Sequence, residues 1–578
     1  MSNTHATAPN HALARRRLKL LFPILTWAGQ YQRGWLRPDL MAGLTVAAFA
    51  VPEDMAYASL AGLAPQHGLY ASLISMLVYA CVGTSRQLSY GVTSALSIMV
   101  AGSLGAMAFS SPDQYLAAAG FVAVMAGAMA IVAWALRLGV IANFVSESVL
   151  TGFSAGAALF IASSQISKLF GIEGVSGNFF DRIANVLRNL GETSGTTLAL
   201  GLVSLAVLLV LEELLPRLPA ALLVVLGAIT VSWAFELAER GVHVAGSIPS
   251  GLPTPAIPTV DSSQALDLVS LAFGVFLLSY IEGVSVARTF AARHRYPVDP
   301  NQELLANGLT NVASGLFRGY SVGGSMSRSA VADNAGAKTP AAGAVAAILL
   351  GVVLLFLTAP FSYLPEATLA AIVFVAVRHL VDISAFRRLW TLSQPEFVAA
   401  LATFGGVLVF GMLEGIIIGV IVTFVGLLIR SAAPQVPQLG RMPGSAEYVD
   451  VSHWPDATVR DDVLVMRSNS GWFYANAGVI RDELMNALAS RDPAPQLVVI
   501  DMATAPLLDL GAIEILTELS EHLANDGIAL RLANLYARNH ELLTKAHEGM
   551  AAQRPHLTVD EAIESWECRS DPARTSIA

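Results

Sequence analysis

Small polar residues and one arginine interrupt a strongly apolar region at residues 319–328, where the sequence is GYSVGGSMSR. Gly323 and Gly324 allow the backbone to run extended and then turn sharply. Ser325 is a favourable N-cap for a short helix that would begin there, at membrane depth. The free N–H groups of such a helix start and the positive end of its dipole favour anions. Because Arg328 adds a full positive charge one turn further on, this segment predicts an anion-binding site.

A second segment of similar composition, SYGVTSALS, occupies residues 89–97. It lies near the third apolar span of the first half of the chain, and residues 319–327 lie near the third span of the second half. Two helix starts that converge with Ser and Thr hydroxyls would form one anion site. The alternative is that small residues here only permit close helix packing. The matching positions of the two segments favour the anion site.

Two carboxyl side chains lie inside apolar spans. Glu282 lies well within the span 268–290, and an ionised side chain at such depth costs about 2.5–3.5 kcal/mol and usually has a function. Burial favours its neutral form and a nearby arginine its ionised form, so it could bind and release protons near neutral pH. The alternative is a structural ion pair with Arg328 or another cation. Glu53 is the second such carboxylate, although Glu53 and Asp54 could instead mark the end of the first span.

These residues need a membrane-embedded scaffold, and the composition predicts one. The chain has 578 residues, of which 54% are hydrophobic and 13% charged, against about 25% charged in soluble proteins. Runs such as 341–359 and 198–215 approach the ~20 apolar residues that cross a bilayer. We predict an α-helical polytopic membrane protein with fourteen segments between residues 38 and 431, several of them too short to cross alone.

The segments divide into two halves of seven, at about 38–240 and 262–431, so the second half would be inserted in the opposite orientation. Inverted repeats with interrupted helices at matching positions indicate a binding site near the membrane midplane. Arg and Lys at residues 15–19 place the N-terminus in the cytoplasm, and the even number of spans places the C-terminus there too. Three cations fall on the opposite face, against this rule: Lys168, Arg182 and Arg188.

Both ends of the chain differ from the membrane part. Residues 1–37 are basic with interleaved Leu, Phe and Trp, which predicts a cytoplasmic amphipathic helix at the membrane surface. A Pro- and Gly-rich linker at 432–444 precedes a small α/β cytoplasmic domain at 445–578. Cys81 and Cys568 are too far apart in sequence and compartment to predict a disulfide. In the last domain, strands are expected within 461–468, 495–504 and 527–534, and helices within 476–490 and 510–526.

Several ordered motifs resemble the sulfate permease (SulP) family of anion transporters, and the C-terminal domain resembles the STAS domain of that family. The resemblance covers about residues 35–565. Its motifs are VPEDMAYASLAGLAPQHGLYAS (51–72), GTSRQLSYG (83–91), YIEGVSVARTFA (280–291), DPNQELLANGLTNVASGLFRGYSVGGSMSRSAV (299–331) and AGAKTP (335–340).

The resemblance implies a uracil-permease-like fold with a core domain and a gate domain, an anion bound between spans three and ten, and an elevator-like motion of the core. The family usually has Gly-Pro and Gly-Tyr-Pro at its two helix breaks, where this chain has Gly91-Val92 and Gly319-Tyr320-Ser321. The resemblance also implies proton rather than sodium coupling, because Glu282 is followed by Val286. With the segments above, it gives the anion-site residues as Tyr57, Thr93, Gly324, Ser325, Ser327 and Arg328, with Glu282 and Glu53 coupled to protons.

We therefore predict a secondary active transporter of the plasma (inner) membrane, and not an enzyme. Its expected action is H+-coupled symport of sulfate or a related small anion, with a dicarboxylate such as fumarate or succinate, or bicarbonate, as the alternative substrate. An anion channel and a membrane-anchored STAS sensor are alternatives of another class. No ATP-binding P-loop motif is present in the sequence. No cofactor, metal or nucleic acid is expected, and the family suggests a homodimer.

Overall fold

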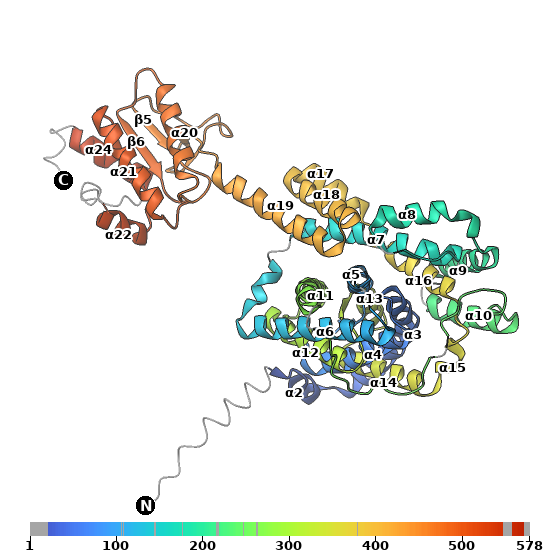
Figure 1. Ribbon diagram of the computed structural model, residues 1–578. Coiled ribbons are helices and arrows are strands. Elements are labelled where there is room, and N and C mark those ends of the chain that lie inside the picture. Colours follow the sequence, from blue (N-terminus) through green and yellow to red (C-terminus); the bar gives the residue numbers. More distant parts are fainter. Residues whose placement is uncertain are drawn as a thin grey trace, which may run out of the picture. The chain divides into compact units, whose positions relative to one another are not determined.

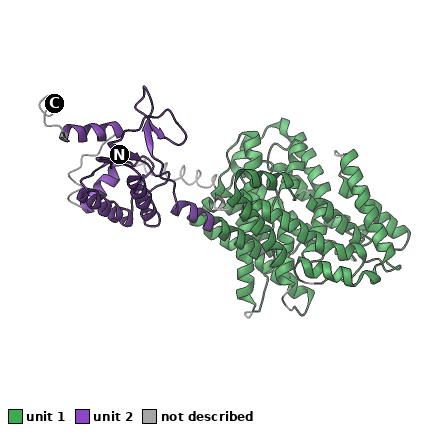
Figure 2. Cartoon of the chain, turned by 90° about the horizontal axis from the view of Figure 1, so that it is seen from above, with its two compact units in different colours: residues 1–423 green, residues 424–578 purple. Residues whose placement is uncertain are grey.

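The chain divides into two compact units, Met1–Thr423 and Phe424–Ala578 (Figure 2). The predicted N-terminal amphipathic helix lies largely outside the described residues; what is described of residues 21–35 forms short turns of helix rather than one continuous helix, at Ile24–Trp27, Ala28–Gln30 and Arg33–Trp35. The computed structural model describes residues 21–546 and 558–570, apart from 106, 108, 144, 145, 176, 216–218, 247, 262, 263 and 379.

The first unit is helical, and its segments follow the same order in two successive halves (Figure 1). In each half, the third segment is a three-residue strand followed by a short helix. The first half contains α3 (Leu36–Leu60), α4 (Gln66–Val82), β1 (Ser89–Gly91) with α5 (Ser94–Leu104), α6 (Pro112–Ala135), α7 (Glu147–Phe170), α9 (Gly195–Leu214) and α10 (Ala220–Ala234). The second half contains α11 (Ala265–His294), α12 (Pro300–Leu316), β2 (Gly323–Ser325) with α13 (Met326–Asn334), α14 (Ala341–Phe356), α16 (Glu366–Arg378), α18 (Gln394–Val409) and α19 (Met412–Ala432). Shorter helices lie between them: α8 (Phe179–Arg188), α15 (Thr358–Phe361) and α17 (Ile383–Leu392).

The packing of these helices shows that the halves are related. Helix α3 packs on α14, and the equivalent pair with the halves exchanged, α11 on α6, also packs. Exchanging the halves in the same way relates the packing of α4 on α14 to that of α12 on α6. It also relates the packing of α7 on α18 to that of α16 on α9. The first four segments of each half thus form one bundle, the core, and the later segments form a second, the gate. Helix α3 contacts α10 and α16 of the gate.

The length and composition of the helices suit a bilayer. Within the described residues, six helices are long and apolar enough to span a membrane, among them α6, α7, α9 and α11. Helices α4, α5, α10, α14 and α18 are apolar but shorter. The short helices α5 and α13 need the surrounding bundle, because each begins next to buried residues, where polar backbone ends require partners.

The second unit contains a small α/β domain. Its three-stranded parallel sheet has the order β5 (Val463–Met466), β6 (Leu497–Asp501) and β7 (Ala529–Ala533), and both faces bury apolar side chains. All three strands and two helices predicted from sequence are present. Asp509 caps the helix α21, whose first residue, Leu510, is exposed. The remaining elements are β3 (Leu439–Arg441, inside the predicted linker), β4 (Tyr448–Asp450), α20 (Ala477–Ala489), α21 (Leu510–Asn525), α22 (Ala537–Ala546) and α24 (Val559–Ser570).

Candidate functional site

The two interrupted segments meet in the core (Figure 1). Strands β1 and β2 pair antiparallel over three residues each, with Tyr90 opposite Gly324 and Gly91 opposite Gly323. Helices α5 and α13 start within three residues of these strands, so the pairing brings their N-terminal ends together. The sequence predicted that these segments converge, but it did not predict the strand pairing that joins them.

Each helix start has a hydroxyl cap. The Thr93 hydroxyl accepts a hydrogen bond from the Leu96 N–H at 3.4 Å, and the Ser325 hydroxyl accepts one from the Arg328 N–H at 3.3 Å. The remaining N–H groups of a first helical turn have no acceptor within their own helix. Two sets of such donors therefore lie side by side, which is an arrangement that favours an anion.

Side chains from neighbouring helices satisfy the backbone where it leaves helical geometry. Both amide atoms of Asn311 on α12 bind the backbone of Val322 at 3.0 Å, and Ser314 donates to the Tyr320 carbonyl at 2.6 Å. On the other segment, Ser75 of α4 donates to the Tyr90 carbonyl at 3.1 Å. Irregular backbone at membrane depth requires such partners. The breaks therefore form although neither segment contains a proline.

Two glycines are required here by close approach. A Cβ atom on Gly91 would lie 2.5 Å from the Ser72 hydroxyl and 2.8 Å from a guanidinium nitrogen of Arg328. A Cβ atom on Gly324 would lie 2.7 Å from the Cα atom of Gly283 on α11. Neither space accommodates a side chain unless the surrounding groups shift, so both breaks depend on glycine.

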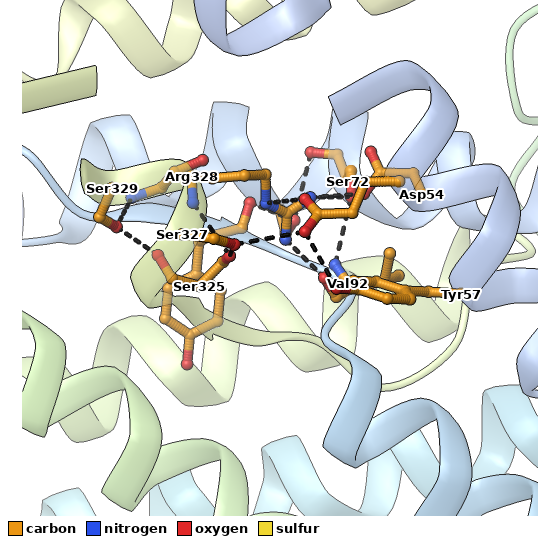
Figure 3. Close-up of polar contacts among 12 residues, drawn as sticks. Asp54, Tyr57, Ser72, Val92, Ser325, Ser327, Arg328 and Ser329 are labelled. Atoms are coloured by element: carbon orange, nitrogen blue, oxygen red, sulfur yellow. Dashed lines mark hydrogen bonds and ion pairs between the residues drawn. The ribbon is translucent and has the colours of Figure 1, made fainter. Parts of the chain in front are cut away.

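Arg328 connects α13 to the first half of the core (Figure 3). Its side chain is 0% exposed and donates to the Asp54 carboxylate, to the Val92 carbonyl at 2.5 Å and to the Ser72 hydroxyl at 3.4 Å. Its Nε atom lies 3.5 Å from a carboxylate oxygen of Glu53. The sequence predicted that Arg328 would offer its charge to the anion, whereas the structure shows it in an ion pair with Asp54. Much of its charge therefore holds the two halves together.

Glu53 belongs to a hydrogen-bonded group at the start of α13. Its Oε1 atom accepts from the Tyr57 hydroxyl at 3.0 Å and from the Ser327 hydroxyl at 3.3 Å. The hydroxyls of Ser325 and Ser327 lie 3.1 Å apart, and the Ser327 side chain is exposed. Glu53 and Asp54 lie inside α3, which continues to Leu60, so they do not mark the end of the first span.

Glu282 lies at the other break. It is half-buried on α11 and accepts a hydrogen bond from the Thr93 hydroxyl at 3.2 Å. In the described part of the chain, no Arg, Lys or His nitrogen lies within 4.0 Å of its carboxylate, and Arg328 pairs with Asp54 and Glu53 instead. Both glutamates therefore accept hydrogen bonds from hydroxyls, and they differ in that Glu53 also has a cation beside it.

A cavity of about 340 Å³ reaches Glu53 from the gate side. It is lined by Phe49 and Glu53 of α3 together with side chains from α9, α10 and α16. Among them are Glu212 and Arg378, which form an ion pair at 2.6 Å. The cavity thus lies where the core and the gate bundles meet, next to the hydrogen-bonded group of Glu53.

The structure therefore brings all eight predicted residues to the two breaks, and it adds others that the sequence did not single out. Asp54 is the partner of Arg328, and Ser72, Asn311 and Ser314 support the irregular backbone. The sequence did contain one signal for the support of the backbone. Asn307 and Asn311 lie four residues apart in a largely buried helix, and buried amides need hydrogen-bond partners.

An inverted-repeat membrane protein with two interrupted helices meeting in its core belongs structurally to the secondary transporters. Sequence comparison is more specific: the sulfate permease family matches residues 36–403, and the STAS domain matches residues 455–562. The chain belongs to the sulfate permease family, which is a family of transporters and not of enzymes. The predicted membership and the C-terminal STAS domain are both confirmed.

Curated relatives match nearly the whole chain. A probable sulfate transporter of Mycobacterium tuberculosis (strain H37Rv) is 33% identical over 560 residues, covering 95% of this chain and 100% of the relative. Sulfate transporter 4.1, chloroplastic, of Arabidopsis thaliana is 32% identical over 551 residues, covering 92% of this chain and 79% of the relative.

Solved structures confirm the predicted fold class. The murine Solute Carrier 26 family member A9 anion transporter, in the inward-facing state, has a TM-score of 0.88 and 22% identity, covering 99% of this chain and 97% of that one. The transmembrane domain of the cyanobacterial bicarbonate transporter BicA has a TM-score of 0.59 and 22% identity, covering 68% of this chain and 98% of that one. The membrane unit thus has the expected core and gate arrangement.

Proposed function

We propose that this protein is a secondary active transporter that carries sulfate or a related small anion together with protons. The observation that supports it most directly is the β1–β2 pairing, which brings the N-terminal ends of α5 and α13 together at membrane depth. Thr93, Gly324, Ser325 and Ser327 contribute hydroxyls and backbone near these ends, and Tyr57 closes the group from α3. The similarity to relatives named as sulfate transporters makes sulfate the first substrate to test.

The balance of charges supports proton coupling. Three carboxyl groups, Glu53, Asp54 and Glu282, lie around the two breaks, with the single guanidinium of Arg328 between two of them. If all were ionised, the site would be negative and would repel an anion. A proton on Glu282 removes one negative charge, and the protonated carboxyl can donate a hydrogen bond. Loading the anion would then favour loading the proton, which is the basis of symport.

The elevator-like motion is supported by the arrangement of the two bundles. Both helix starts and all three carboxyl groups belong to the core, whereas α9, α10 and α16 of the gate line the cavity at Glu53. A displacement of the core against the gate would move the whole site and leave its internal hydrogen bonds unchanged. The Glu212–Arg378 pair neutralises the cationic side chain in that cavity, so an anion leaving the site would not be held there.

The remaining expectations follow from the same proposal. The protein would lie in the plasma (inner) membrane with the N-terminus and the STAS domain in the cytoplasm, and it would form a homodimer. The N-terminal residues 1–37, a membrane part at 38–431 and a STAS part at 445–578 remain the proposed functional division.

The proposal is tested by uptake into proteoliposomes that contain the full chain. Sulfate, bicarbonate, chloride and fumarate are supplied in turn, with and without an inward proton gradient. We expect saturable uptake of one of them that the gradient accelerates, and we expect Glu282→Gln to abolish this acceleration. Asp267→Asn is the matched control, because Asp267 is exposed and lies on the same helix.

Each other outcome identifies an alternative. Flux that does not saturate and ignores the proton gradient would identify an anion channel. Absence of flux with every anion would favour the STAS sensor. Wild-type stimulation by the gradient in Glu282→Gln would show that another group binds the proton.

A further inference from the structure

A second cavity, of about 320 Å³, lies between the C-terminal ends of α3 and α5 and the helices α7 and α8. Ser59 lines it and lies six positions after Glu53 along α3, a rise of about 9 Å at 1.5 Å per residue. The cavity at Glu53 includes Phe49, which lies on the N-terminal side of Glu53 along the same helix. The two cavities therefore open toward opposite ends of α3, with the paired breaks at the level between them.

Two cationic side chains line this second cavity. The ammonium of Lys168, near the end of α7, donates to the Ser59 carbonyl at 3.2 Å, which bridges the gate and the core. The guanidinium of Arg182 on α8 lies 4.3 Å from the centre of the Phe160 ring, and its Nε donates to the Gly177 carbonyl at 3.1 Å. Among the described residues, neither cation has a carboxylate within 4.0 Å.

The cavity is positively charged and has unused hydrogen-bond donors. None of the described residues that line it is Asp or Glu, and Glu366 attracts Lys168 from beyond ion-pair distance. In the described structure, Lys168 uses one of its three N–H donors and Arg182 one of its five. Half-burial of a cation without a counter-charge costs free energy of folding unless another group pairs with it. A small anion would fit the volume and supply the missing acceptors.

We infer that this cavity is a second anion-binding site, in which Lys168 and Arg182 hold a small inorganic oxyanion at the membrane face where α3 ends. The binding follows from the cavity itself, whereas its role as the entry or exit point of the transported anion rests on the proposed function. It also accounts for two of the cations that depart from the positive-inside pattern, since they serve a ligand rather than topology. The bond between Lys168 and Ser59 would be exchanged for the anion when the core moves against the gate.

The binding is tested by calorimetry with inorganic sulfate and the full chain in detergent. We expect two sulfate ions per chain in the wild type and one in the double variant Lys168→Gln, Arg182→Gln. The control is Arg188→Gln, because Arg188 lies on α8 like Arg182, is exposed and is not among the residues that line the cavity. Thermal unfolding of each variant shows whether it is folded. Sulfate binding by the folded double variant with the stoichiometry and affinity of the wild type would overturn the inference.

The role in transport is tested with membrane vesicles of both orientations. Each single variant is expected to raise the KM for sulfate on the order of tenfold per lost charge when sulfate is supplied from the face where α3 ends. The KM from the opposite face is expected to stay unchanged, and Arg182→Lys is expected to restore most of the loss. Equal changes from both faces would assign these side chains a structural role. If the wild type transports no anion, the proposed function fails, and calorimetry still decides whether the second site exists.

Discussion

The two interrupted segments have the same backbone design and different charges. In each, a three-residue strand leads into a helix with a hydroxyl cap, and a glutamate from the first helix of the other half lies beside that helix start. Glu53 of α3 contacts Ser327 of the second half, and Glu282 of α11 contacts Thr93 of the first. Of the two segments, 89–97 and 319–328, only the second contains an arginine, Arg328, whose side chain also reaches the Val92 carbonyl of the first.

This difference suggests a division of labour between related halves. At the second-half break, Arg328 compensates Asp54 and Glu53, so the charge there is fixed by a buried network. At the first-half break, the Glu282 carboxylate accepts a hydrogen bond from Thr93 and has no cation within 4.0 Å among the described residues. The repeated backbone thus presents a capped helix start twice, and a few side chains give the two breaks different charge environments.

The largest effect is expected from Arg328→Ala, which would remove the feature that distinguishes the two breaks. It leaves the Asp54 carboxylate and the Val92 carbonyl without their partner in the core. Breaking a buried ion pair from one side costs about 3–5 kcal/mol, so we expect both a lower free energy of unfolding and weak anion binding. Thermal unfolding in detergent and sulfate titration measure the two effects.

The matched variant is Arg328→Ala with Asp54→Asn, which removes both charges. We expect it to recover stability without recovering anion affinity. If the single variant unfolds like the wild type, Arg328 does not hold the halves together and the proposed asymmetry is wrong.

A smaller effect is expected from Gly91→Ala, which tests the backbone that the two breaks share. The new methyl group would lie 2.5 Å from the Ser72 hydroxyl, and relief of that overlap costs about 1–3 kcal/mol. We expect a reduced unfolding temperature and a reduced transport rate. Gly102→Ala is the control on α5, where a Cβ atom meets nothing within 4 Å. Equal behaviour of the two variants would refute the claim that close packing sets the break.

Thr93→Val tests the first-half break alone. It keeps the shape of the side chain but removes the cap on Leu96 and the hydrogen bond to Glu282, at a cost of about 1–2 kcal/mol. We expect the pH dependence of uptake to shift, since the hydrogen bond from Thr93 to the Glu282 carboxylate is lost. Thr93→Ser should retain the wild-type profile. A Val variant with an unshifted profile would separate Thr93 from proton coupling.

The smallest effect on stability is expected from Ser327→Ala at the second-half break. Its exposed hydroxyl donates to Glu53 at 3.3 Å, and substitution of an exposed residue usually changes stability by no more than about 0.5 kcal/mol. A fall in sulfate affinity at unchanged unfolding temperature would place this hydroxyl on the anion. Unchanged affinity would limit the binding surface at α13 to its cap and backbone.

Much of the fold could be predicted because membrane spans and α/β strands have strong local signals. Apolar length located the spans, and β-branched runs located β5, β6 and β7. The caps Thr93 and Ser325 followed from residue type and position. The pairing of Arg328 with Asp54 could not be predicted, because it joins residues 274 positions apart and depends on how α3 and α13 pack. The support given by Ser72 to Val92 is tertiary for the same reason.

The strand pairing has a mechanical consequence. Hydrogen bonds between β1 and β2 couple α5 and α13, so the two helix ends cannot part without breaking that ladder. Separating α5 from α13 to open a path for the solute would break these hydrogen bonds. Moving both helices together against the gate would keep all of them. Spin labels on α5 and α13 are thus expected to report one constant separation throughout the transport cycle, while labels on α3 and α16 report at least two.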